Sequence, residues 1–219
     1  WIKEIFMWPS PRPEDEGISL ILNLIKEMPS KFNNIGAELG REMSLRMPLV
    51  DFFSLKSNLS KNIIDASPIL WELRIIKSNA EIDKINKICK ITSDAYENLP
   101  LLIKEGDSER DISRKLRIDL ISRGADSIPF LPIVSGEGGV SQIICEPTNR
   151  RLKNGDILFI DTGSTYDGYF CDFDRNYSIG KVSDIVNDVY EILWIATQSA
   201  IDIAKPGITL SDLWQIMVE

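Results

Sequence analysis

Residues 155–180 decide the fold of this chain and read GDILFIDTGSTYDGYFCDFDRNYSIG. The four consecutive apolar residues at 157–160 are typical of a buried strand. Asp167-Gly168 follows at the spacing of a two-residue β-turn, and a tyrosine flanks it on each side. The sequence therefore predicts an antiparallel hairpin in which the chain folds back on itself at this turn.

Three aspartates of this hairpin are predicted to share one face of the sheet. If Asp167-Gly168 is the loop, Asp161 lies opposite Asp174 and Gly163 lies opposite Asp172, and residues at these positions point the same way. Carboxylates packed together repel one another unless a cation, shared protons or water relieves the repulsion. Two interpretations stay open at this point: a divalent-metal site, or the hydrated outer face of an exposed hairpin.

The composition is that of a globular protein with an acidic balance. The chain has 219 residues, of which 43% are apolar and 26% are charged, enough for one medium domain or one domain with part of another. The net charge of −8, with no long basic run, argues against a nucleic-acid partner. No apolar run approaches the ~20 residues that cross a bilayer, so we expect no membrane partner either.

Cysteine and histidine usage narrows the chemistry. Cys89, Cys145 and Cys171 are far apart and show no C-x-x-C spacing, which argues against a disulfide framework or a thiolate zinc site. We therefore expect a reducing, cytoplasmic location. The chain contains no histidine, so carboxylates must carry whatever metal chemistry these residues contribute.

Residues 1–76 alternate between helical and strand patterns. Amphipathic spacing predicts a helix over 18–26 and a second short helix after Pro48. Short strands are predicted at 34–39 and 62–65. This alternation indicates an α/β unit, and with so few elements we expect it to be the C-terminal part of a larger domain.

Residues 77–219 have a different order, and we place the domain boundary near Lys77. The segment Ser78–Glu81 is a capping box that begins a long helix, and Ser108 begins a second helix that ends at Gly124. After this second helix, the residue pattern is typical of β-strands. The last residue, Glu219, falls within a helical pattern, so we expect the chain to be a fragment of a longer protein.

Two further strands are predicted between these helices and the hairpin. They lie at 128–134 and 141–145, and the glycine-rich residues 135–139 between them match neither G-x-G-x-x-G nor a P-loop. We therefore interpret 135–139 as a plain hairpin turn. After the hairpin, an apolar stripe predicts an amphipathic helix over 184–205, and another helix begins near Thr209.

The order helix, helix, hairpin, followed by GDILFIDTG with Tyr169 and Asp172, resembles the first half of the pita-bread metallohydrolase domain. Methionine aminopeptidases, Xaa-Pro aminopeptidases, prolidases and creatinase share this domain. Residues 63–83, IIDASPILWELRIIKSNAEID, resemble the creatinase and prolidase branch in particular. The resemblance implies an α/β (α+β) fold, with the C-terminal part of a creatinase-like N-terminal α/β domain in 1–76 and a truncated first half of the pita-bread domain in 77–219.

The resemblance also implies a metal site. In that family the first acid and the second, eleven residues later, are metal ligands, which implies Asp161 and Asp172 as ligands of two divalent ions. Mn, Co, Fe or Zn would suit these oxygen donors and would activate a water. The family's remaining ligands, one His and two Glu, come from the second half of the domain and are expected beyond Glu219.

Two positions depart from the family pattern. The family usually has Thr where this chain has Asp174, which could be a third ligand, a protonated partner of Asp161, or an anion neutralised by Arg175. The active-site histidine of many members lies three residues before a proline, and by that register Ile144 takes its place here. Isoleucine can neither donate a hydrogen bond nor carry a proton.

The function that the resemblance implies is that of a metallopeptidase of the aminopeptidase or dipeptidase type, a hydrolase acting on a small peptide or amide. Ile144 and Asp174 keep two alternatives open. One is a non-peptidase of the same fold that acts on a small zwitterionic metabolite, and the other is a catalytically inactive relative that only binds. The branch with an N-terminal α/β domain is commonly dimeric, so we expect a homodimer.

Overall fold

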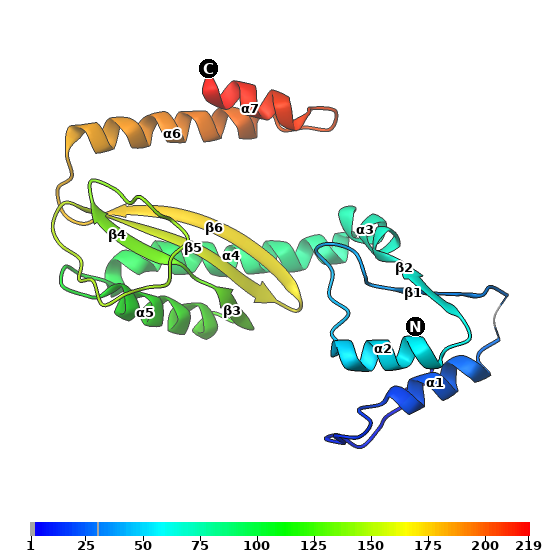
Figure 1. Cartoon of the computed structure of the whole chain (residues 1–219). Coiled ribbons are helices and arrows are strands. Elements are labelled where there is room, and N and C mark those ends of the chain that lie inside the picture. Colours follow the sequence, from blue (N-terminus) through cyan, green and yellow to red (C-terminus); the bar gives the residue numbers. More distant parts are fainter. Residues whose placement is uncertain (1–2, 30) are drawn as a thin grey trace. The chain divides into compact units, whose positions relative to one another are not determined.

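The computed structural model describes residues 3–29 and 31–219, and the chain divides into two units, Trp1–Lys77 and Ser78–Glu219 (Figure 1). Both units mix helices with strands, which confirms the mixed α/β class expected from the sequence. Within the described residues, no helix is both long enough and apolar enough to cross a membrane.

The first unit is built on two parallel strands. Strand β1 (Asn34–Ala37) pairs with β2 (Asn62–Asp65) along its whole length, and helix α2 (Leu49–Asn58) connects them. Helices α1 (Ile18–Glu27) and α3 (Ser67–Ile75) precede and follow this strand–helix–strand segment. Helices α1 and α2 and both strands lie where the sequence patterns predict them, within one or two residues.

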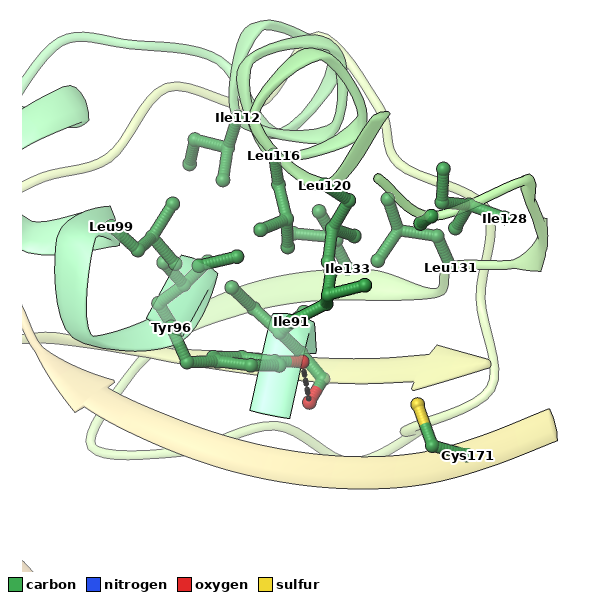
Figure 2. Packing of buried hydrophobic residues seen from close by; sticks show 14 of the residues in the cluster. Ile91, Tyr96, Leu99, Ile112, Leu116, Leu120, Ile128, Leu131, Ile133 and Cys171 are labelled. Atoms are coloured by element: carbon green, nitrogen blue, oxygen red, sulfur yellow. Dashed lines mark hydrogen bonds between the residues drawn. The ribbon is translucent and has the colours of Figure 1, made fainter. Parts of the chain in front are cut away.

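The second unit begins with the two helices predicted from their capping residues. Helix α4 (Asn79–Leu102) starts at the Ser78 capping box, and α5 (Glu109–Ser122) starts at a capping box formed by Ser108. The two helices pack against each other and against one face of a sheet (Figure 1). Their buried stripes form the core shown in Figure 2, whose main members are Ile88, Ile91, Tyr96, Leu99, Ile112, Leu116 and Leu120.

The sheet is centred on its longest strand, β5 (Asp156–Tyr166). Strand β6 (Tyr169–Ser178) pairs with one edge of β5 as the predicted hairpin, and β3 (Ser127–Phe130) and β4 (Ile133–Glu137) share the other edge. All of these pairings are antiparallel. Helix α4 contacts β5 and β6, so the hairpin has one face covered by this helix and one face turned away from it.

Three predictions for the region before the hairpin are wrong. The single strand expected at 128–134 is two strands with a break at Pro132, which lacks the backbone N–H that a continuous ladder needs. The expected hairpin turn at 135–139 lies largely within β4, which runs on to pair Glu137 with Asp156. Residues 141–145, all described by the structure, form no strand, because β5 already uses both of its edges.

Two helices follow the hairpin, as expected. Helix α6 (Asp184–Ile203) ends before Pro206, and α7 (Leu210–Val218) starts at a capping box formed by Thr209. The two helices pack against each other. Neither buries a residue among those that the structure describes, so the apolar stripe that predicts α6 remains exposed in this chain.

Candidate metal centre

The hairpin has the register that its sequence predicts. Asp161 pairs with Asp174 and Gly163 pairs with Asp172. The backbone φ angle is +47° at Asp167 and +80° at Gly168. Two-residue hairpin turns of this kind require a positive φ at both central residues. A two-residue turn fixes the register of every pair behind it, so the three acidic residues occupy one face of the sheet.

Burial alternates along β5 and identifies which face the acids occupy. Thr162 and Ser164 are fully buried on the side of α4, whereas Asp161 between the covered positions is only half-buried. Asp172 and Asp174 of β6 are exposed. The three carboxylates therefore lie on the face turned away from α4.

Asp161 has the most unfavourable electrostatic environment of the three. Burial raises its pKa to about 6, and the negative charges of Asp174 and Asp172 contribute in the same direction. Burial also raises the pKa of Asp174, as does the charge of Asp172, while Arg175 opposes the shift. The acidic face is thus strained by mutual repulsion, which a bound cation would relieve.

One oxygen of Asp161 is both buried and without a hydrogen-bond donor. Among the described residues, Asp161 Oδ1 is the buried side-chain polar atom for which no partner is found. Buried polar atoms almost always have a partner, so an exception needs a specific explanation. A buried carboxylate oxygen that accepts nothing from the protein fits the role of a metal ligand.

Two other buried carboxylates of the same unit are fully satisfied. Glu109, 2% exposed, accepts four hydrogen bonds from the amides and hydroxyls of Ser135 and Thr148. Asp156, with no exposed surface, forms a two-pronged pair with Arg150 at 2.6 and 2.7 Å. These acids stabilise the fold, and the contrast with them makes the incomplete bonding of Asp161 distinctive.

The chain does not supply a complete metal site. No group of three Asp, Glu or Cys side chains is arranged to hold a metal ion within residues 3–29 and 31–219. A metal ion held by Asp161 and Asp172, with Asp174 beside them, would therefore receive only part of its ligand shell from these side chains. Carboxylates suit hard divalent ions, and five or six ligands are usual for such ions, so water or other protein groups would have to complete the shell.

Arg175 occupies the other face of β6, as strand alternation predicts. Its guanidinium lies 5.0 Å from the ring centre of Phe173 and 6.0 Å from that of Tyr96. It donates a hydrogen bond to the backbone carbonyl of Asp174 at 2.7 Å. The bond goes to the backbone and not to the carboxylate, which leaves direct neutralisation of Asp174 by Arg175 as the weakest of its three predicted roles.

Ile144, which takes the histidine position in the family register, lies in the segment between β4 and β5. Its side chain is 69% exposed. The end of this segment is held by the bonds from Thr148 to Glu109 described above. Neither these bonds nor the contacts of the buried Tyr96 hydroxyl with Thr162 of β5 and the Phe173 carbonyl of β6 can be predicted from the sequence, because they join residues far apart in the chain.

Comparison with known proteins places the chain in a family. The family model described as metallopeptidase family M24 matches residues 83–219. The chain is 31% identical over 181 residues to Xaa-Pro dipeptidase from Pyrococcus furiosus. The matched region covers 83% of this chain and 52% of the relative.

Solved structures agree in fold. The X-Pro aminopeptidase from Thermotoga maritima MSB8 superposes with a TM-score of 0.79 at 26% identity, over 92% of this chain and 56% of that one. The prolidase from Pyrococcus horikoshii OT3 gives a TM-score of 0.76 at 28% identity, over 90% and 55%. The chain spans about half the length of the curated relatives that it matches. With well over half of its residues matched by the family model, the chain belongs to metallopeptidase family M24.

Proposed function

We propose that this chain forms part of a divalent-metal-dependent hydrolase that cleaves a small peptide of the Xaa-Pro type. The observation that carries the proposal is the buried, unpartnered oxygen of Asp161 on a face that it shares with Asp172 and Asp174. Relatives named Xaa-Pro dipeptidase and prolidase support the choice of peptide substrate. That choice rests on family likeness, whereas the metal site rests also on the chemistry of these side chains.

Asp161 and Asp172 are the proposed ligands, and Asp174 is a third candidate. Two ions of Mn, Co, Fe or Zn would be held jointly by these carboxylates and by ligands outside the described residues. A divalent ion bound there supplies an activated water and a Lewis acid for the scissile carbonyl. The part of this chain is to present the carboxylates on adjacent strands, in a register fixed by the Asp167-Gly168 turn.

Metal binding by the longest available form of the protein is the direct test. Isothermal titration with Mn²⁺, followed by elemental analysis after dialysis, should detect binding by the wild type. Asp161→Asn and Asp172→Asn should each weaken it strongly, because each removes an anionic ligand. Asp188→Asn, an exposed carboxylate on α6, is the matched control for loss of one negative charge. Equal binding by all four proteins would rule out the proposed site.

The peptidase assignment needs a separate assay. Cleavage of Xaa-Pro dipeptides by the longest available form of the protein should stop on treatment with a chelator and return with Mn²⁺ or Co²⁺. A protein that binds metal through Asp161 but leaves these dipeptides intact would have the proposed site without the proposed substrate.

Ile144 favours a second candidate. A chain that carries an exposed isoleucine where many family members use a histidine lacks that proton carrier. Such a protein could act on a small zwitterionic metabolite, or it could bind a ligand without turning it over. Compatible solutes assayed beside the dipeptides separate these alternatives, and Ile144→His should raise turnover only if the missing histidine limits it.

We also propose that the protein is a cytoplasmic homodimer. The three cysteines form no disulfide, which suits a reducing compartment, and the creatinase and prolidase branch supplies the expectation of a dimer. Light scattering coupled to gel filtration measures the oligomeric state, and a monomer at micromolar concentration would contradict this part of the proposal.

A further inference from the structure

A buried tyrosine lies directly behind the acidic face. Tyr96 of α4 is 4% exposed, and its hydroxyl contacts both strands of the hairpin. The hydroxyl oxygen lies 2.6 Å from Thr162 Oγ1, 3.4 Å from the carbonyl oxygen of Ile160 and 3.3 Å from that of Phe173. One side-chain atom of a helix therefore joins the backbones of β5 and β6.

These contacts lie at the centre of the acid-bearing segment. Thr162 pairs with Phe173 across the two strands. Thr162 is the neighbour of Asp161 in the chain, and Phe173 lies between Asp172 and Asp174. Successive side chains of a strand point to opposite faces. The tyrosine therefore contacts the two strands on one face of the sheet, directly behind the carboxylates on the opposite face.

The hydroxyl groups can serve these contacts together. If Thr162 donates its proton to the Tyr96 oxygen, the phenolic proton is free to go to the carbonyl of Phe173 or of Ile160. Burial raises the pKa of Tyr96, so the phenol keeps this proton and remains a donor at neutral pH. When that proton goes to Phe173, the hydroxyl links the Thr162 side chain of β5 to the backbone of β6 through one group.

The ring of Tyr96 is itself held in place. It stacks on Phe173 and on Tyr177, with ring centres 6.3 Å apart in each case and interplanar angles of 17° and 7°. The Tyr177 hydroxyl donates to the backbone carbonyl of Tyr96 at 2.9 Å. Figure 2 shows Tyr96 among the aliphatic side chains of the core, which fix α4 against the sheet. The hydroxyl is therefore a rigid reference point for the hairpin.

We propose that Tyr96 is a positioning residue for the metal site, whose hydroxyl fixes the backbones of β5 and β6 so that Asp161 and Asp172 are presented together. The inference rests on the proposed function, since it concerns the carboxylates assigned there as ligands. It adds a residue that touches neither metal nor substrate. Groups that orient ligands from behind commonly change metal affinity 10–100-fold when they are removed.

Tyr96→Phe tests the inference, because it removes the hydroxyl and keeps the ring. Tyr169→Phe is the matched control: it removes another hydroxyl that joins β6 to α4, by donating to Glu81 at 2.9 Å beside the hairpin turn. Titration of the longest available form of the protein with Mn²⁺ should show affinity about tenfold weaker in Tyr96→Phe and close to that of the wild type in Tyr169→Phe. Thr162→Val, which removes the other hydroxyl, should behave like Tyr96→Phe.

Several outcomes are decisive. Urea midpoints and circular dichroism should show that Tyr96→Phe and Tyr169→Phe are both folded, so a loss of Mn²⁺ affinity confined to Tyr96→Phe identifies positioning. Equal Mn²⁺ affinity in the two variants overturns the inference while leaving the metal site intact. If the wild type and Asp161→Asn bind Mn²⁺ equally, the proposed function itself fails. Amide exchange then decides the positioning role: unchanged protection at residues 160–162 and 172–174 in Tyr96→Phe overturns it.

Discussion

At the scale of single residues, three carboxylates of the second unit differ in how completely their buried oxygens are hydrogen-bonded. Glu109 and Asp156 lie inside the fold, and every one of their oxygens accepts a hydrogen bond. Asp161 is partly buried, faces two like charges and leaves one oxygen without a donor. Folding alone would select against such a residue, so its presence indicates a function that outweighs the loss of stability.

Replacing Asp161 by Asn should stabilise the metal-free chain. The substitution removes a negative charge that lies beside Asp172 and Asp174, and the gain should be about 1 kcal/mol, typical of a like-charge contact across a strand pair. Urea unfolding at pH 8 in the presence of a chelator measures it, with Asp188→Asn as the control. If Asp161→Asn is the less stable protein, the acidic face is not strained as we infer.

The pair between Asp156 and Arg150 predicts how stability depends on pH. The bond to Arg150 holds the pKa of Asp156 below its usual range, and at Glu109 the bonds from Thr148 and Ser135 outweigh the opposite effect of burial. Both pKa values are lower in the folded state than in the unfolded one. Their contribution is therefore complete above the unfolded pKa of about 4 and is lost as the pH falls through the folded value.

Asp156→Asn should accordingly cost about 2 kcal/mol at pH 7, because it leaves the guanidinium of Arg150 without its anion. The difference from the wild type should shrink as the pH falls below about 4, because the unfolded carboxyl then takes up a proton that the folded carboxylate resists. Urea unfolding at pH 7, 5 and 3 measures both proteins. A difference that stays constant across this range would mean that the pair does not carry the pH dependence.

At the scale of elements, the hairpin could be predicted because all of its information is local. Asp167-Gly168 selects the turn, and the period of two along a strand then assigns every partner, as the observed register confirms. The strand expected at 141–145 failed because strand patterning says nothing about whether a partner edge is free. The break at Pro132 has a different cause, because this proline is a local breaker that outweighs the apolar run around it.

Gly168→Ala tests the importance of that turn. The φ angle of +80° strains any residue with a Cβ, while a Cβ at this position would meet no atom within 4 Å, so the cost is conformational only. We expect a loss of about 1 kcal/mol in the free energy of unfolding, measured in urea. Gly168→Asn should lose less, because asparagine tolerates the left-handed region. Equal losses in the two variants would point to a cause other than the turn conformation.

At the scale of the whole molecule, the sequence indicated most of the elements but not what covers them. The apolar stripe of α6 resembles a core-facing surface, yet Val189 and Leu193 are 59% and 52% exposed. Likewise the three acids could be predicted to share a face, whereas the oxygen left unpaired on Asp161 and the hydroxyl behind it depend on contacts between α4 and the hairpin. Hydrophobic periodicity predicts which way a side chain points, whereas the residue that it contacts is known only from the folded structure.

Limited proteolysis can test the division of the chain at Lys77 and Ser78. The last turn of α3 buries no side chain, with Ile75 63% and Ile76 81% exposed, so it should fray and offer an extended stretch to a protease. By contrast, α4 starts at a complete capping box and is anchored in the core. Trypsin should therefore cut first after Lys77 or Arg74, and mass spectrometry should find a resistant product that begins at Ser78 or Ile75. Lys77→Gln should shift the first cut to Arg74, whereas early cuts within α4 would show that the second unit is not the more stable of the two.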